Sequence, residues 1–271
     1  MRATSEVAGV FDRAADTYDD VGVPWFGPIA DGLVDELAVQ PGERVLDIGC
    51  GRGAALRPLA EATGPTGSAL GIDLAPRMVE RTRDDLGGLP QVEVRVADAT
   101  APGLPPGSFD VVCASLVLFF MPDPGATLRT WAELLVPGGR IGVSTFSAQD
   151  DRWRQLDDVF VPYLPPEILD ARTSGRTGPF GSDEGMERLA ADAGLTDVRT
   201  THRTVTAVFR DAQHYLEFSW SHGQRAMWER VPEAERTRVR DTLATMVDDF
   251  REPDGTARLH QEVRYTLARC P

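Results

Sequence analysis

Short apolar runs alternate with helix-like segments from about residue 44 to residue 146. The apolar runs predict five strands, at residues 44–48, 69–73, 92–97, 109–115 and 140–146. Helices are predicted to begin near Gly53, Pro76 and Gly125, and a Val-Pro-Gly-Gly breaker ends the third of them before the fifth strand. Continuous apolar strands separated by helices indicate a parallel sheet that is covered on both faces. We therefore expect an α/β fold with right-handed crossovers.

The chain after residue 146 loses this rhythm. Residues 148–181 are rich in Asp, Arg, Pro and Gly, which predicts an excursion over the mouth of an active site. A capped helix at 182–193 and a strand at 198–210 follow, then helical apolar spacing over 212–251 and a closing strand at 263–268. We expect one domain over residues 1–271. Its core is predicted at about 40–147, 182–210 and 255–271, and its helical lid insertions at about 1–30, 148–181 and 211–252.

The composition, 42% hydrophobic and 26% charged, is that of an ordinary globular chain. No apolar stretch approaches the roughly 18 to 20 residues of a membrane helix, and the start of the chain lacks the apolar core of a signal peptide. The three cysteines are odd in number and far apart, which favours reduced thiols. We therefore expect a cytoplasmic protein that does not act at a membrane.

The charged residues and histidines exclude several classes of function. A net charge of −14 argues against nucleic acid as a partner, because phosphates are neutralised by concentrated basic surfaces. All 28 basic residues are Arg, so Schiff-base chemistry, a P-loop lysine and a Tyr/Lys dehydrogenase pair are absent. No spacing of His, Cys and carboxylates resembles a metal site, so no metal is expected. His202 is expected to be structural, and His214 and His260 to lie at the surface.

The first strand contains Asp47 and runs into Gly49, Gly51 and Gly53. Glycines in such a turn let the backbone approach a ligand, and amides at the following helix N-terminus are available to bind it. Dinucleotide enzymes carry G-x-G-x-x-G at this place, whereas here the third glycine comes one residue earlier. Asp47 would repel a pyrophosphate but can accept hydrogen bonds from an ammonium group. The pattern favours a ligand with an amino-acid moiety, although a tight turn that serves packing alone would use the same glycines.

Two further carboxylates follow strands. Asp73 ends the second strand about 20 residues after the glycines, where an acidic side chain can accept both hydroxyls of a ribose. Asp98 follows the third strand, where a carboxylate can accept from the exocyclic amine of adenine. Taken alone, Asp98 is equally explained as a solvent-exposed turn residue. Because parallel strands end at one edge of a sheet, Asp47, Asp73 and Asp98 are predicted to contact a single adenosine-bearing ligand.

The segments around these carboxylates resemble the class I S-adenosylmethionine (SAM)-dependent methyltransferases. Residues 11–19 match the F-D-x-x-A-x-x-Y-D opening of the UbiE-like, small-molecule group of that family. Residues 109–123 and 134–140 resemble the family's fourth-strand motif and its link into the fifth strand. The resemblance covers roughly residues 11–146. It implies a Rossmann-like seven-stranded sheet whose last strand is antiparallel, with helical lid insertions, SAM as cofactor and S-adenosylhomocysteine (SAH) as product.

The resemblance also implies which residues contact SAM. Tyr18 would close over the methionine end, and Leu74 and Met78 would flank the ribose and the adenine. The other predicted contacts to SAM are the strand-end carboxylates, two glycines of the turn and two further residues that end or follow strands. These are Asp47, Gly49, Gly51, Asp73, Asp98, Ala99 and Ser115.

The helical segment at 212–251 holds an aromatic and polar cluster around His222. His222 and Tyr18 are the candidate catalytic residues; the alternatives for His222 are a helix cap or a core partner of Trp220. A base is needed only if the acceptor atom must lose a proton during in-line displacement of the methyl group. By aromatic or basic character and by position in the lids, the side chains predicted to contact the acceptor are Trp25, Phe119, Trp153, Tyr163, Trp220 and His222.

The activity predicted from these features is methyl transfer to a small-molecule acceptor, with natural products among the candidates, by a monomer or a homodimer. Oxygen, nitrogen and carbon all stay open as the acceptor atom. Two alternatives also stay open: a SAM-binding cyclase that transfers no methyl group, and an NAD(P)-dependent oxidoreductase on a Rossmann fold. The glycine spacing and the lack of lysine oppose the oxidoreductase.

Overall fold

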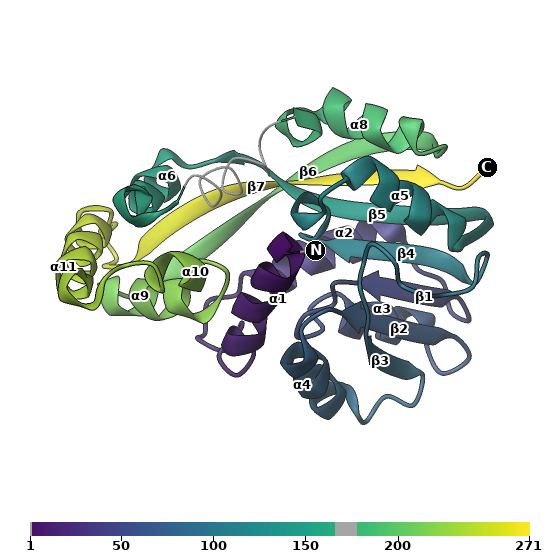
Figure 1. Cartoon of the computed structure of the whole chain (residues 1–271), viewed down its shortest axis with the longest axis horizontal. Helices are drawn as coiled ribbons and strands as arrows, with labels where there is room; N and C mark the ends of the chain where they lie inside the picture. The colour runs from purple at the N-terminus through teal and green to yellow at the C-terminus, as the bar shows by residue number, and fades with distance from the viewer. Residues whose placement is uncertain (1, 166–177) are drawn as a thin grey trace.

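The computed structural model describes residues 2–165 and 178–271, which form an α/β molecule built on one mixed sheet (Figure 1). The strand order is β3-β2-β1-β4-β5-β7-β6. β7 runs antiparallel to both of its neighbours, whereas the pairings among β1 to β5 are parallel. The predicted seven-stranded Rossmann-like sheet is therefore confirmed. The strands are β1 (Arg44–Ile48), β2 (Ser68–Asp73), β3 (Val92–Val96), β4 (Phe109–Ser115), β5 (Leu135–Gln149), β6 (Thr196–Phe209) and β7 (Ala257–Arg269).

Helices cover both faces of this sheet. Leu33 of α2 and Leu56 of α3 belong to the core on one face, whereas Trp131 of α5 and Met186 of α8 belong to the core on the other. The α-helices are α1 (Arg2–Ala14), α2 (Phe26–Leu37), α3 (Leu56–Thr63), α4 (Pro76–Leu86), α5 (Pro124–Glu133), α6 (Asp151–Asp158), α8 (Asp183–Asp192), α9 (Ala212–Ser221), α10 (Arg225–Trp228) and α11 (Glu233–Asp249). The short 3₁₀ helices within residues 2–165 and 178–271 are η1 (Leu118–Phe120), η2 (Val161–Tyr163) and η3 (Gly178–Gly181).

Local sequence signals fix where several helices begin. Pro76 and Pro124 each stand in the first turn of their helix, where a missing amide hydrogen costs nothing. The Asp123 carboxylate accepts a hydrogen bond from the Ala126 amide at 2.8 Å and caps α5. The Ser182 hydroxyl caps α8 in the same way. These caps hold the connections at the carboxyl ends of the strands, where the predicted site lies.

Two strands are longer than their apolar runs predicted. β5 begins at Leu135, which pairs with Phe109 ahead of a register shift, so the Val-Pro-Gly-Gly breaker lies inside the strand. β7 begins at Ala257 rather than at residue 263, because its pairing with β6 continues through His260 and Glu262. Polar residues at alternate positions of β7 hid this extension. β7 and β6 extend together away from the rest of the sheet toward α9 and α11 (Figure 1).

The predicted helical insertion at 212–251 forms α9, α10 and α11. The expectation that His214 lies at the surface is wrong, because this residue is only 2% exposed. The Asp211 side chain caps α9 by accepting the His214 amide at 2.8 Å, and the His214 ring contacts the Val21 carbonyl at 2.8 Å. α9 is thereby tied to the segment that follows α1. The predicted excursion at 148–181 includes residues 166–177, which lie outside the described residues. None of the described helices combines the length and apolarity needed to cross a membrane.

Candidate functional site

The glycine turn after β1 needs its glycines for two different reasons. Gly49 and Gly51 both have positive φ, at 67° and 50°, a backbone region that other residues rarely adopt. A Cβ on Gly49 would lie 2.4 Å from Cγ2 of Val117, so the turn is packed tightly against the residue two positions after β4. A Cβ on Gly51 would meet nothing within 4 Å. The turn therefore packs on the protein at Gly49 and opens toward unfilled space at Gly51.

Asp47 lies beside this turn and is 1% exposed. Its Oδ2 has no hydrogen-bond partner among the described residues. Burial, and after it the negative charge of Asp73, raises the pKa of the Asp47 carboxyl well above its usual range. A buried carboxylate oxygen without a partner is costly, and a ligand ammonium group would pair with it. An unpaired acceptor for a positively charged donor therefore lies at the end of β1.

Asp73 links the glycine turn to the end of β2. Its Oδ2 accepts the Gly51 amide at 2.9 Å, and its Oδ1 accepts the Ala75 amide at 2.8 Å. Burial is the main cause that raises the pKa of the Asp73 carboxyl. The Leu74 amide also stabilises this carboxylate. A carboxylate has about four lone-pair sites, so three backbone amides leave room for a further donor such as a ribose hydroxyl.

The turn after β3 holds Asp98 and Ala99 in a fixed geometry. Oδ1 of Asp98 accepts the Thr100 amide at 2.8 Å and the Thr100 hydroxyl at 2.7 Å. Oδ2 of Asp98 makes neither of these bonds and is available for a ligand amine. The indole of Trp131, which is fully buried in α5, donates to the Ala99 carbonyl at 2.8 Å. Sequence reasoning missed Trp131, although a Trp on the inward face of α5 was a usable signal.

The end of β4 is fixed by a second residue that the sequence did not indicate. Oγ of the buried Ser144 lies 3.0 Å from Oγ of Ser115 and accepts the Leu116 amide at 3.0 Å. Leu116 adopts φ of 58°, which is uncommon for a residue with a branched side chain. Val117, which packs on Gly49, follows directly. Ser144 therefore holds the turn that closes the glycine loop from the other side.

Residues predicted to flank the adenosine also come together. Met78 is 1% exposed and packs with Ala15 and Ala75, and Tyr18 is partly buried against this small cluster. Leu74 follows Asp73 directly and is half-buried. Burial, with the charges of Asp19 and Asp73 behind it, raises the pKa of the Tyr18 phenol well above its usual range. Tyr18 therefore stays a neutral hydrogen-bond donor, which disfavours it as a base.

Beyond the glycine turn, aromatic side chains form a closed series of ring contacts with centroid distances from 4.3 to 6.5 Å. We call this series the aromatic circuit. Of the predicted acceptor contacts, it includes three, and Trp153 packs on it through Trp25 at 5.4 Å. Tyr163 and Trp220 have no ring contact with it: Tyr163 accepts a hydrogen bond from Arg238, and Trp220 lies against Trp228. The circuit consists of Phe11, Tyr18, Trp25, Phe26, Phe119, Phe120, Phe146, Phe218 and His222.

Among the rings of the circuit, His222 carries a basic nitrogen that can accept a proton. Its Nδ1 lies 2.6 Å from the Phe218 carbonyl, which accepts only a protonated nitrogen. Burial lowers the pKa of His222 to about 4, so the ring is neutral near pH 7. With Nδ1 protonated, the lone pair of the neutral ring is on Nε2. The ring packs on Phe218 and Phe26, not on Trp220.

Comparisons with known proteins agree with this geometry. A family model described as a methyltransferase domain matches residues 46–143. The chain is 37% identical over 243 residues to nocamycin O-methyltransferase from Saccharothrix syringae, covering 85% of this chain and 86% of that protein. It is 41% identical over 167 residues to the aklanonic acid methyltransferase DauC from a Streptomyces species, covering 61% and 76%. The YcgJ protein from Bacillus subtilis shares the fold, with a TM-score of 0.57, 16% identity, and coverage of 89% and 97%.

The fold and these matches together define a class I SAM-dependent methyltransferase. The chain belongs to this family, whose members transfer the methyl group of SAM to an acceptor. The residues fit the cofactor, since Asp47 offers an unpaired buried carboxylate oxygen and Gly51 leaves open the space that a Cβ would occupy. The NAD(P)-dependent oxidoreductase alternative is therefore wrong.

Proposed function

We propose that this chain O-methylates a small natural product whose reacting part is largely apolar. One relative, matched over most of its length, is named an O-methyltransferase, and another is named for methylation of aklanonic acid. The observation that carries the proposal is the neutral His222, which has a free lone pair on Nε2 and packs on Phe26. Phe26 in turn stacks on Tyr18, which packs against the Met78 cluster. A proton acceptor next to an apolar surface suits a hydroxyl on a hydrophobic molecule.

In this proposal SAM supplies a methyl group activated by its positive sulfonium centre. Asp47 would pair with the ammonium group, Asp73 would accept from the ribose hydroxyls, and Asp98 would accept from the adenine amine. Gly49, Gly51, Ala99 and Ser115 would line the site between these carboxylates, and Leu74 and Met78 would flank the nucleoside. Tyr18 would cover the methionine end from the side of α1.

The aromatic circuit provides the acceptor surface. Within the described part of the chain, no ring contact joins Tyr18 or Phe26 directly to Phe119 or Phe146. In this proposal a flat or apolar acceptor would lie between these two sides of the circuit. Trp25 and Trp153 support one side. The described residues of the segments at 1–30, 148–181 and 211–252 would then act as lids that keep water from the reacting atoms.

His222 Nε2 would accept the hydroxyl proton while the oxygen bonds to the methyl carbon and the methyl–sulfur bond breaks. The positive charge then moves from the sulfonium to the imidazolium. An oxygen that gains a methyl group while still protonated becomes strongly acidic, so even an imidazole with a pKa of about 4 can take its proton. The nearby aromatic faces favour a cation throughout.

The test is incubation with methyl-labelled SAM and a panel of apolar acceptors that carry a hydroxyl, a carboxyl or an amine. Label on the oxygen of a hydroxylated acceptor, with kcat reduced about 100-fold in His222→Phe, is the expected result. Label on nitrogen or carbon contradicts O-methylation. Unchanged kcat in His222→Phe contradicts the base and indicates an acceptor oxygen that is already ionised. SAM-dependent rearrangement of an acceptor without label would instead establish the cyclase alternative.

A further inference from the structure

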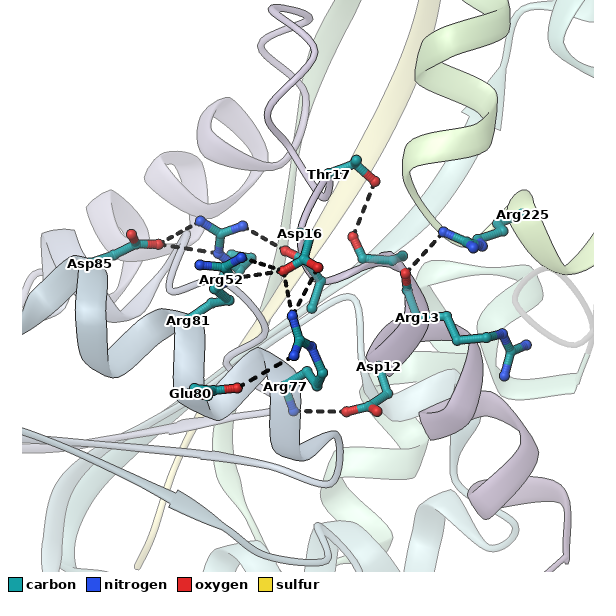
Figure 2. Close-up of polar contacts among 12 residues, drawn as sticks. Asp12, Arg13, Asp16, Thr17, Arg52, Arg77, Glu80, Arg81, Asp85 and Arg225 are labelled. Carbon is teal, nitrogen blue, oxygen red and sulfur yellow. Dashed lines mark hydrogen bonds and ion pairs between the residues drawn. The ribbon is translucent and has the colours of Figure 1, made fainter.

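The end of α1 and the residues that follow it lie between the cofactor site and the helical insertion, and polar contacts join them to both (Figure 2). On the cofactor flank, Oδ1 of Asp12 accepts the Arg77 amide in the first turn of α4 at 2.7 Å. The Asp16 carboxylate accepts from the Arg77 guanidinium at 2.8 Å and from Arg81 Nε at 2.8 Å. α1 thus satisfies an amide at the start of α4 that no side chain of α4 caps.

The glycine turn itself takes part in this flank. Arg52 stands between Gly51 and Gly53 and donates from Nη1 to the Ala15 carbonyl at 2.6 Å. Its other nitrogens bond Asp85 on α4, with the shorter contact at 2.6 Å. Ala15 is fully buried and packs on Met78. One side chain from the cofactor loop therefore holds the segment that carries Tyr18.

On the opposite flank, α1 is tied to α10, which begins three residues after His222. Arg13 donates to both carboxylate oxygens of Glu229, from Nε at 3.0 Å and from Nη2 at 2.5 Å. Arg225 Nη1 donates to the Arg13 carbonyl at 2.9 Å, and Arg225 Nε also bonds Glu229. Hydrogen bonds to Arg13 are the main cause that lowers the pKa of Glu229. We call Arg13, Arg225 and Glu229 the α1–α10 latch.

We propose that α1 couples the cofactor site to the acceptor site, with Arg52 and the α1–α10 latch as positioning residues. SAM or SAH on the glycine turn holds Arg52 and the residues after α1 in place. Because the latch joins α1 to α10, the same event orders the segment that carries His222. Couplings between two sites in one protein are commonly about 5- to 150-fold in affinity. The inference rests on SAM binding by the family and holds whichever acceptor is used.

In this proposal the cofactor does not contact α10; the latch causes α1 and α10 to become ordered together. The latch is half-exposed on the Arg13 side, at 51% of its side chain, so its ion pair alone adds little stability. Its effect comes from joining two segments that would otherwise move independently. Loss of the latch is therefore expected to leave the fold and the cofactor site intact while it releases α10.

Hydrogen exchange of the wild-type protein with and without SAH tests the coupling, since SAH needs no acceptor. We expect SAH to slow exchange in peptides covering residues 11–18 and also residues 222–231. In Glu229→Gln, SAH should bind within about threefold of wild-type affinity and still protect 11–18. Protection of 222–231 should be reduced, because glutamine lacks the charge and the second oxygen that Arg13 Nη2 contacts. Arg52→Gln should weaken SAH binding about tenfold and lose both protections. The control is Arg95→Gln, which removes an exposed ion pair on β3 and should behave as wild type.

Steady-state kinetics give a second readout. Glu229→Gln should lower kcat about tenfold with little change in the KM for SAM, because His222 is misplaced while the cofactor site is intact. Circular dichroism verifies that each variant is folded. The inference is overturned if SAH protects 222–231 equally in wild type and Glu229→Gln, or if it leaves 222–231 unprotected in the wild type. Equal effects of Glu229→Gln and Arg95→Gln would also overturn it.

Discussion

Substituting alanine at Gly49 or at Gly51 separates two requirements of the glycine turn: close packing on Val117 at Gly49 and open space at Gly51. Both positions have positive φ, which costs about 1–2 kcal/mol for a residue with a Cβ. At Gly49 the new Cβ would also lie 2.4 and 2.9 Å from the two methyl carbons of Val117. Overpacking of that kind costs about 1–3 kcal/mol. At Gly51 no atom lies within 4 Å of the new Cβ.

The two substitutions should therefore differ in stability. Alanine recovers about 0.4–1 kcal/mol by restricting the unfolded chain. Gly51→Ala is then expected to lower the free energy of unfolding by about 1 kcal/mol, and Gly49→Ala by about 2–4 kcal/mol. Urea denaturation monitored by fluorescence measures both values. The double variant with Val117→Ala should be less destabilised than the sum of the single changes by about 1–3 kcal/mol, because the clash is removed.

Gly51→Ala should lose less stability than Gly49→Ala but more affinity for SAH. The Cβ of Gly51→Ala would occupy the space where the backbone must approach SAM, so SAH affinity should fall at least tenfold despite the small cost in stability. Equal stability losses at the two positions would refute the packing of Gly49 on Val117. Wild-type SAH affinity in Gly51→Ala would refute the glycine turn as the cofactor cradle.

Three further substitutions test other parts of the site. His222→Phe removes a group whose pKa is about 4 in the folded protein and about 6.5 when unfolded, so the wild type should lose about 2 kcal/mol more stability than the variant between pH 7 and pH 5, by denaturation at each pH. Stability falls as the pH is lowered because His222 takes up a proton in the unfolded chain and not in the folded chain. An equal pH dependence in wild type and His222→Phe would contradict the lowered pKa of His222. Asp47→Asn should leave the thermal midpoint unchanged or raise it, because the asparagine oxygen can still accept the Leu56 amide, while calorimetry shows at least tenfold weaker SAH binding; a lowered midpoint would mean that Oδ2 also has a structural partner. Trp131→Phe leaves the Ala99 carbonyl without its donor, so it should cost about 1–3 kcal/mol of stability and raise the KM for SAM. An unchanged KM would mean that this hydrogen bond does not affect the cofactor site.

The sequence predicted those parts of the fold that local signals determine. β1 and β4 have the predicted bounds, and α4 begins at Pro76 as expected. β5 and β7 exceed their predictions, because partner strands continue the pairing past residues that break an apolar run. His214 was misplaced, because the Asp211 cap turns it toward Val21, a contact 193 residues apart in the chain. Long-range packing of this kind leaves no trace in a local pattern.

The candidate site divides in the same way. Asp47, Asp73 and Asp98 could be proposed from the sequence because each lies at or just after the end of a strand, and parallel strand ends share one edge. Trp131 and Ser144 could not, because they act on Ala99 and Leu116 from other elements. Of the other rings of the aromatic circuit, Phe11 was noted only as part of the family's opening motif, and Phe26, Phe120, Phe146 and Phe218 were not predicted to contact the acceptor.

The central claim is that carboxylates at the strand ends hold SAM, and calorimetry of SAH binding to wild type and Asp73→Asn tests it most directly. Asparagine retains the shape of the side chain, but its NH2 group can accept neither a loop amide nor a ribose hydroxyl, so the variant loses one of the two loop contacts and one acceptor for the ribose diol. The account predicts that SAH binds the wild type and that the folded variant binds it at least tenfold more weakly, with a stability loss of about 1–3 kcal/mol from the unpaired loop amide. Equal affinity for the two proteins would contradict it.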